Sequence, residues 1–130
     1  GWAWVKTDYA ANKRSVPNTP AVLTVSSIRD GISNTIGLGE KAFNSSEQLP
    51  SSWHWDEPIF VGGSDSTVRD GLLIVRDGDW RFRKNWGSAH SSKACFTSLD
   101  GSTHWISDKI ASDVLLDLTT IAGGGSNRLP

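Results

Sequence analysis

Apolar and polar residues alternate along several short stretches of the chain, and this period of two predicts β-strands. In one of these stretches Gly37 and Gly39 share a face, which indicates that another part of the protein packs closely against them. A second stretch, residues 21–25, is rich in β-branched residues, and Ser27 is placed to cap a brief helical turn that follows this stretch. The predicted strands lie within residues 2–11, 21–25, 33–41 and 53–55.

Two Asp-Gly pairs, Asp77-Gly78 and Asp100-Gly101, each separate two runs with strand character. An Asp-Gly pair suits a tight turn because its backbone adopts positive φ at little cost, so both pairs predict β-hairpins. The first hairpin would join residues 72–75 to 80–83, and the second would join residues 93–99 to 102–107.

One amphipathic helix is predicted near the end of the chain. Asp108 is a suitable N-cap, and three consecutive glycines from Gly123 to Gly125 provide a stop signal. Between them, apolar residues recur at i, i+4, i+8 and i+11, namely Ile110, Val114, Leu118 and Ile121. These elements predict an α+β fold with a mostly antiparallel sheet, its hairpins, and one C-terminal helix.

Length and composition favour one globular domain over residues 1–130, because seven Trp among 130 residues supply a core although only 37% of the chain is hydrophobic. The 13 basic and 14 acidic residues nearly cancel, which argues against nucleic acid as a partner. No apolar run approaches the roughly 18 residues of a spanning helix. The chain contains no Met, so we expect a further segment upstream of Gly1 in the intact gene product.

Residues able to perform chemistry do not form a recognisable catalytic or metal-binding motif. The three histidines, His54, His90 and His104, lack the close spacing of zinc ligands, and the lone Cys95 excludes an internal disulfide. Aspartates gather in the predicted turns at positions 65, 70, 77 and 79, where they more often bond backbone N–H groups than bind calcium. We therefore expect no metal, no cofactor and no enzymatic activity.

The tryptophans allow two interpretations. Trp53, Trp55, Trp80 and Trp105 fall inside predicted strands, which favours a place in the core. Alternatively, Trp53 and Trp55, or the loop over residues 62–79, form a platform that stacks on glycans. Trp2 and Trp4 are candidates for an exposed apolar patch that meets a partner.

Two separated motifs occur together in the chain. The first is Asp-Gly-Ile-Ser-Asn-Thr-Ile at residues 30–36, continuing to Gly39-Glu40-Lys41, and the second is His90, nine residues, and then Asp100-Gly101-Ser102. Together they resemble the bacterial pilin-like family with a D-G-x-S-N-T-I segment and an H-x9-D-G signature. The family's motif positions here are Asp30, Gly31, Ser33, Asn34, Thr35, Gly39, Glu40, His90, Asp100, Gly101 and Ser102.

This resemblance, to type IV prepilins and type II secretion pseudopilins, implies a globular head that lacks its N-terminal apolar helix. Residues 42–86 would be the variable region, and residues 90–125 the C-terminal hairpin and helix. The implied function is that of a non-enzymatic structural subunit of a filament or envelope complex, located outside the cell or in the envelope. Its partners would be proteins, and membrane contact would come only from the absent helix.

A soluble glycan-binding module and an accessory subunit of an envelope complex remain the alternative functions. Loss of the helix would leave one face of the sheet with exposed apolar patches. Glu40 and His90 are expected to form a partly buried, charge-assisted pair that locks the two motifs together.

Overall fold

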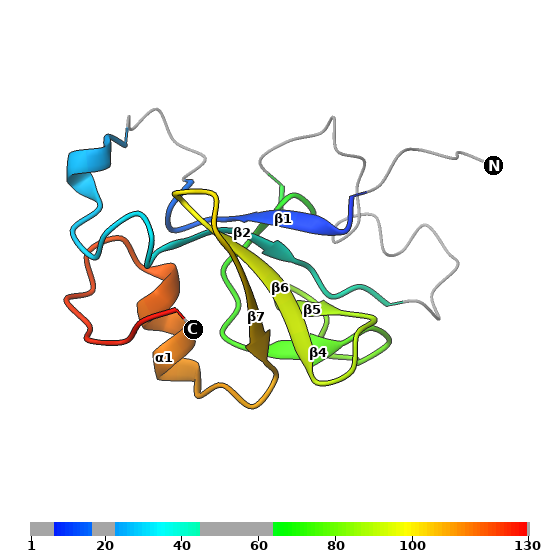
Figure 1. Cartoon of the computed structure of the whole chain (residues 1–130). Coiled ribbons are helices and arrows are strands. Elements are labelled where there is room, and N and C mark those ends of the chain that lie inside the picture. Colours follow the sequence, from blue (N-terminus) through cyan, green and yellow to red (C-terminus); the bar gives the residue numbers. More distant parts are fainter. Residues whose placement is uncertain (1–6, 17–22, 45–63, 130) are drawn as a thin grey trace.

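The computed structural model describes residues 7–16, 23–44 and 64–129 (Figure 1). Trp2, Trp4, Trp53 and Trp55 lie outside these ranges. The described elements are β1 (Tyr9–Asn12), the 3₁₀-helix η1 (Val25–Ser27), β2 (Ile36–Glu40), β3 (Val68–Arg69), β4 (Ile74–Arg76), β5 (Trp86–Ser88), β6 (Lys93–Ser98), β7 (Thr103–Ser107) and α1 (Ser112–Thr119). No helix among the described residues is both long enough and apolar enough to cross a membrane.

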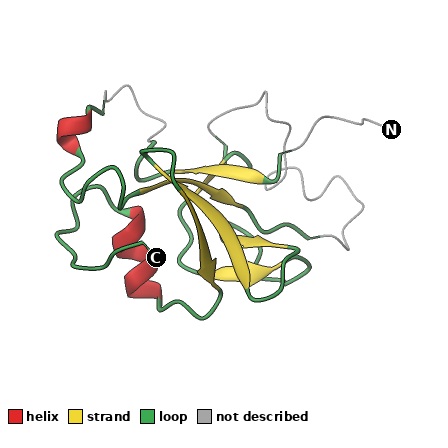
Figure 2. Cartoon of the chain, viewed as in Figure 1, coloured by secondary structure: helices red, strands yellow, loops and turns green. Residues whose placement is uncertain are grey.

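The strands form a five-stranded sheet in the order β3-β1-β2-β6-β7 and a separate pair, β4-β5. Within the large sheet, β1, β2, β6 and β7 pair antiparallel, whereas the short β3 runs parallel to β1. The β4-β5 pair is also parallel. With α1 beside the large sheet (Figure 2), the architecture confirms the α+β fold predicted from the sequence.

The hairpin predicted at Asp100-Gly101 is present and joins β6 to β7. Gly101 has φ of +90°, a conformation that glycine adopts without a steric penalty. The Asp100 carboxylate accepts hydrogen bonds from the Ser102 N–H at 2.9 Å and from the Ser98 hydroxyl at 2.7 Å. The turn is therefore held by its own side chains as well as by the strands.

The hairpin predicted at Asp77-Gly78 is wrong. After β4 the chain makes consecutive turns over residues 77–85 and returns as β5, parallel to β4. The Gly78 N–H bonds the Phe43 carbonyl at 3.0 Å, so this turn is used for a contact distant in sequence. Phe82 is buried against Ala42 and Val75 while its neighbours Arg81 and Arg83 are exposed, so this stretch turns Phe82 toward the protein interior instead of extending as a strand.

The main core lies between the inner face of the large sheet, the β4-β5 pair and α1. Trp86 is completely buried and packs edge-on against Phe96, with ring centroids 5.4 Å apart. A Cβ at Gly39 would lie 2.5 Å from the Phe96 ring, and one at Gly37 would lie 2.7 Å from Leu99. The close packing predicted for the two glycines is confirmed.

Local bounds differ from the predictions at two other places. The helix begins after Ala111 instead of Asp108, because the Ile110 N–H bonds the Ser107 carbonyl in a turn, and it ends at Thr119, before Ile121. Ile110 and Val114 still pack against the core, as the apolar stripe predicts. In the described part of residues 21–25 no strand is present; Val25 opens η1, whose N-cap is Thr24 and not Ser27.

Two tryptophans predicted to lie in the core are on the surface instead. Trp80 is 81% exposed, in the turn that follows β4, and Trp105 is 49% exposed on β7. Trp105 does lie in a strand, but Ile106 beside it is the residue that faces the core, and successive side chains in a strand point to opposite faces.

Candidate functional site

The face of the large sheet that points away from the core, called the outer face here, carries a row of chemically distinct side chains. Tyr9 of β1 pairs with Glu40 of β2, and Cys95 of β6 pairs with Trp105 of β7. The β2-β6 register, with Gly39 opposite Phe96, places Glu40 beside Cys95. Three strand spacings of about 4.8 Å make this row roughly 14 Å long.

Apolar groups are exposed along the outer face. Tyr9 is 45% exposed, Trp105 is 49% exposed, and Leu38, two residues before Glu40 on the same face of β2, is 39% exposed. A β-bulge between Ile36 and Leu38 shifts the alternation of β2, which explains why Ile36 is buried in the core while Leu38 is exposed. The inner face buries its apolar residues, so the exposed apolar groups of the sheet are concentrated on the opposite side.

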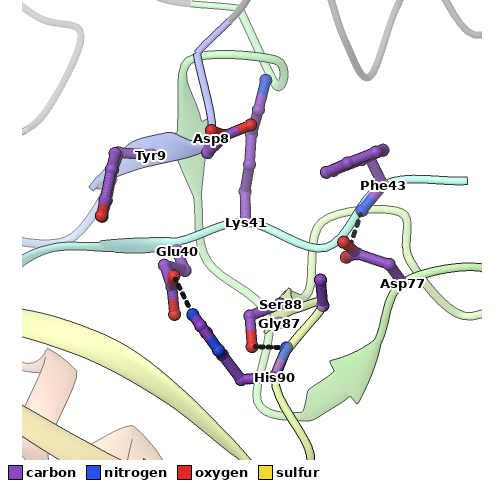
Figure 3. A pocket seen from close by; sticks show the side chains of 10 residues that line it. Asp8, Tyr9, Glu40, Lys41, Phe43, Asp77, Gly87, Ser88 and His90 are labelled. Carbon is purple, nitrogen blue, oxygen red and sulfur yellow. Dashed lines mark hydrogen bonds and ion pairs between the residues drawn. The ribbon is translucent and has the colours of Figure 1, made fainter. Parts of the chain in front are cut away.

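His90 reaches over this row from the loop between β5 and β6. Its backbone N–H bonds the Ser88 hydroxyl at 3.0 Å, and its Nε2 lies 3.6 Å from Oε1 of Glu40 (Figure 3). The imidazole also meets the Trp105 ring edge-on, with centroids 5.1 Å apart. The structure thus contains the Glu40–His90 pair predicted from the sequence, and it adds an aromatic contact.

Glu40 links the strands as well as meeting His90. Its Oε2 accepts the Cys95 backbone N–H at 2.6 Å, and its side chain is only 12% exposed against 53% for His90. The Glu40 carboxylate is the largest cause of the raised pKa of Tyr9. Burial, and then Glu40, raise the pKa of the Cys95 thiol, so this thiol is less reactive than a free cysteine.

A pocket of about 250 Å³ adjoins the row where β1 and β2 meet the β5–β6 loop (Figure 3). Burial raises the pKa of Asp77 on its wall, and the carboxylates of Asp8 and Glu40 add to the effect, while the bond from the Phe43 N–H opposes it. In Figure 3 the Lys41 side chain extends away from the Glu40–His90 pair, and its Nζ donates to the Ser66 carbonyl at 2.9 Å. The pocket lining thus combines three carboxylates with Lys41, His90 and the aromatic residues Tyr9 and Phe43.

A family model described as "Protein of unknown function (DUF1559)" and named SBP_bac_10 matches residues 2–113, most of the chain. The chain belongs to the DUF1559 family. Neither the curated proteins nor the solved structures contain a significant match. The DUF1559 match includes the complete outer-face row, His90 and the Asp100-Gly101 turn, and it ends within α1.

The first motif of this DUF1559 chain holds the C-terminal tail. The Asp30 carboxylate accepts the backbone N–H groups of Gly123 and Gly124 at 2.7 and 3.1 Å. The Asn34 amide donates to the Asn127 carbonyl at 2.7 Å and accepts the Leu129 N–H at 2.8 Å. Asp30 and Asn34 therefore have a structural task that the sequence interpretation did not specify.

Other motif residues shape the turn between these contacts and β2. Gly31 has φ of +90°, and the Thr35 hydroxyl donates to the Gly31 carbonyl at 3.0 Å. Backbone bonds from Leu99 to Thr35 and from Asp100 to Ile32 attach the turn to the β6–β7 hairpin. Ser33 is exposed on this turn. The structure thus brings the two sequence motifs of this DUF1559 chain together.

Sequence reasoning missed three surface residues: Tyr9, Trp80 and Trp105. For Trp105 the alternation in Thr-His-Trp-Ile-Ser shows that Trp105 and Ile106 face opposite sides, but not which of them faces the core. Tyr9 carries the same ambiguity beside the buried Ala10. The tryptophans assigned to a partner or glycan surface, at positions 2, 4, 53 and 55, lie outside the described residues, so that prediction stays untested.

Proposed function

We propose that this DUF1559 chain is the globular head of a pilin-like protein of the bacterial envelope. In this proposal it is a non-enzymatic subunit that assembles with protein partners in a filament or envelope complex. The two motifs resemble those of pilin-like proteins. In the structure their side chains form hydrogen bonds that stabilise a turn, a hairpin and the C-terminal tail.

The outer face of the sheet is the observation that supports this proposal most. It exposes Tyr9, Leu38 and Trp105 along one side of a sheet whose other side is covered by α1 and the β4-β5 pair. Exposed apolar groups gathered on one face are typical of surfaces that meet another protein. In the proposed assembly, this face is buried against a neighbouring subunit.

The geometry gives less support to a catalytic function for Ser102, His104 and Asp100. Ser102 Oγ lies 3.0 Å from His104 Nε2, which is within reach for a nucleophile and its base. The nearby Asp100 carboxylate, however, bonds the Ser102 hydroxyl at 2.6 Å, whereas an Asp-His-Ser triad needs it on the histidine. Ser102 is exposed on a turn, whereas such chemistry uses an enclosed pocket.

The test is assembly of the native protein in the bacterium that produces it. Leu38→Lys places a charge on the outer face, and Val25→Lys is the matched control because Val25 is 70% exposed on η1. We expect chemical cross-linking of intact cells to capture ordered multimers of the wild type and of Val25→Lys, and far fewer of Leu38→Lys. Equal cross-linking of all three proteins would overturn a role for this face.

The mature N-terminus of the native protein tests the pilin-like part of the proposal separately. Intact mass and terminal peptide sequencing should find a methylated aromatic residue at the start of a long apolar helix. A native start at or near Gly1 would rule out assembly through such a helix. The soluble binding or accessory function would then be favoured.

Glycan binding is the second candidate, and the exposure of Trp80 favours it. At 81% exposure this indole is available to stack on a sugar, and it stands beside the Asp79–Arg81 ion pair, whose atoms are 2.7 Å apart. We expect a sugar panel to shift the Trp fluorescence of the wild type but not of Trp80→Ala. The matched Trp105→Ala variant should keep the response, and absence of any response in the wild type would reject this candidate.

A further inference from the structure

β7 forms an open edge of the large sheet. The strand order places β3 at one edge and β7 at the other, and the two edges differ in length, because β3 has two residues and β7 has five. Figure 1 shows β7 beside β6. An edge strand presents backbone N–H and C=O groups to any further strand that can approach it. β7 is therefore the edge with room for a partner strand.

The hydrogen-bond register shows which groups of β7 are presented. Two backbone hydrogen bonds mark the ends of the ladder between β6 and β7. One runs from the Ser98 N–H to the Ser102 carbonyl, and the other runs from the Asp108 N–H to the Ser92 carbonyl. Hydrogen-bonded pairs in an antiparallel ladder recur at every second residue, so Thr103, Trp105 and Ser107 direct their backbone groups away from β6. Among the described residues, the backbone of Thr103 and Trp105 makes no hydrogen bond to another element.

The edge also lacks the features with which proteins usually block strand pairing. β7 reads Thr-His-Trp-Ile-Ser, without Lys, Arg, Asp, Glu or Pro, and its register with β6 is continuous over five pairs. Edge strands are commonly protected by charged residues, prolines or bulges. Here Trp105 and its exposed neighbours Thr103 and Ser107 leave the edge open to pairing.

We propose that β7 pairs antiparallel with β7 of a second copy of this chain, about a two-fold axis through Trp105. Trp105 then faces Trp105 of the second copy, Thr103 faces Ser107, and His104 faces Ile106. The Ser107 carbonyl already accepts the Ile110 N–H, so the other outward backbone groups of the two strands form about four hydrogen bonds. The two five-stranded sheets become one continuous sheet, and their outer faces become one surface.

Self-complementarity identifies a second copy as the occupant. A two-fold axis pairs the same strand with itself, and in β7 this pairing places no formal charges opposite each other and aligns two hydroxyl residues. The Trp105 ring is contacted by Lys93, whose Nζ lies 4.5 Å from the ring centroid, and by His90. Lys93 belongs to β6 and His90 to the loop before it, and Trp105 remains 49% exposed beside them, which leaves indole surface for the opposing indole.

The first experiment measures self-association of the 130-residue chain by sedimentation equilibrium. Trp105→Lys places two lysines opposite each other at the axis, and we expect it to weaken the dimer at least about tenfold. Leu38→Lys, the variant that disrupts the outer face, should leave the dimer intact. A wild-type chain that stays monomeric, or a dimer that Trp105→Lys does not weaken, would overturn the proposal.

The second experiment fixes the register without altering Trp105. In a Cys95→Ser background, Thr103→Cys and Ser107→Cys are prepared as separate proteins and oxidised alone or mixed. Hydrogen-bonded partners have Cα atoms about 5.5 Å apart, within disulfide range, whereas Thr103 and its own copy are more than about 14 Å apart in this register. We expect disulfide-linked dimers only in the mixture, and equal cross-linking of each protein alone would contradict the pairing.

Discussion

The Glu40 carboxylate makes two contacts that can be separated by mutation. One oxygen accepts the Cys95 backbone N–H at 2.6 Å, and the other lies 3.6 Å from His90. Glu40→Gln keeps an oxygen for the N–H but removes the charge, whereas Glu40→Ala removes both contacts. The two variants therefore measure the ion pair and the hydrogen bond separately.

The structure sets the expected magnitudes. His90 is 53% exposed, so the ion pair has the strength of a surface pair, about 1 kcal/mol or less. The hydrogen bond from a backbone N–H to the largely buried carboxylate is worth about 1.5–3 kcal/mol. For a chain of this length each kcal/mol shifts the melting midpoint by roughly 4 °C, so we expect a small decrease for Glu40→Gln and a clearly larger one for Glu40→Ala.

A double-mutant cycle distinguishes the ion pair from simple packing. The unfolding free energies of wild type, Glu40→Gln, His90→Ala and the double variant, measured by urea unfolding followed by circular dichroism, give the coupling between the two side chains. We expect a favourable coupling of about 1 kcal/mol or less, because the pair lies at the surface. If Glu40→Gln matches the wild type and the coupling is zero, the pair is not a lock.

Three further predictions follow from the packing and the pKa shifts. Gly39→Ala places a Cβ 2.5 Å from the Phe96 ring and should lower the unfolding free energy by about 1–3 kcal/mol in urea titrations. Hydrogen bonds from Ser102 and Ser98 lower the pKa of Asp100 to about 2. The ionised Asp100 therefore stabilises the folded protein fully above the unfolded pKa near 4, and this contribution is lost as the pH falls toward 2. Asp100→Asn should flatten this part of an acid titration of stability. Burial raises the pKa of Asp77, which penalises the ionised form, so Asp77→Asn should stabilise the protein at neutral pH and lose this advantage in acid, as thermal melts at pH 3 and pH 7 can check.

Elements determined by local sequence were predictable. The β6–β7 hairpin forms because the Asp100 carboxylate bonds its sequence neighbours Ser98 and Ser102 and because Gly101 adopts φ of +90°. Asp77-Gly78 has the same two residues, but its groups bond Phe43 and Ser88, which lie far away in the sequence. A dipeptide pattern contains no information about these partners, and for that reason the first hairpin was predicted incorrectly.

The candidate site was only partly predictable. The pairing of Glu40 with His90 followed from the two motifs, since both residues belong to them. The outer-face row did not, because it depends on the register of four strands and on a bulge within β2. Alternation divides each strand into two faces, but only the position of α1 and the β4-β5 pair decides which face becomes the surface.

Asp30 and Asn34 hold residues 123–129 by hydrogen bonds, and these bonds bear on where the folded domain ends. The family match ends at residue 113, yet Leu115 and Leu118 lie in the core, and Leu129 packs against it. We therefore expect the smallest stably folded unit to extend through Leu129, 16 residues past the end of the family match. A recombinant fragment that ends at residue 113 would leave the Asp30 carboxylate and the Asn34 side-chain oxygen without their N–H donors, and it would expose the core to water.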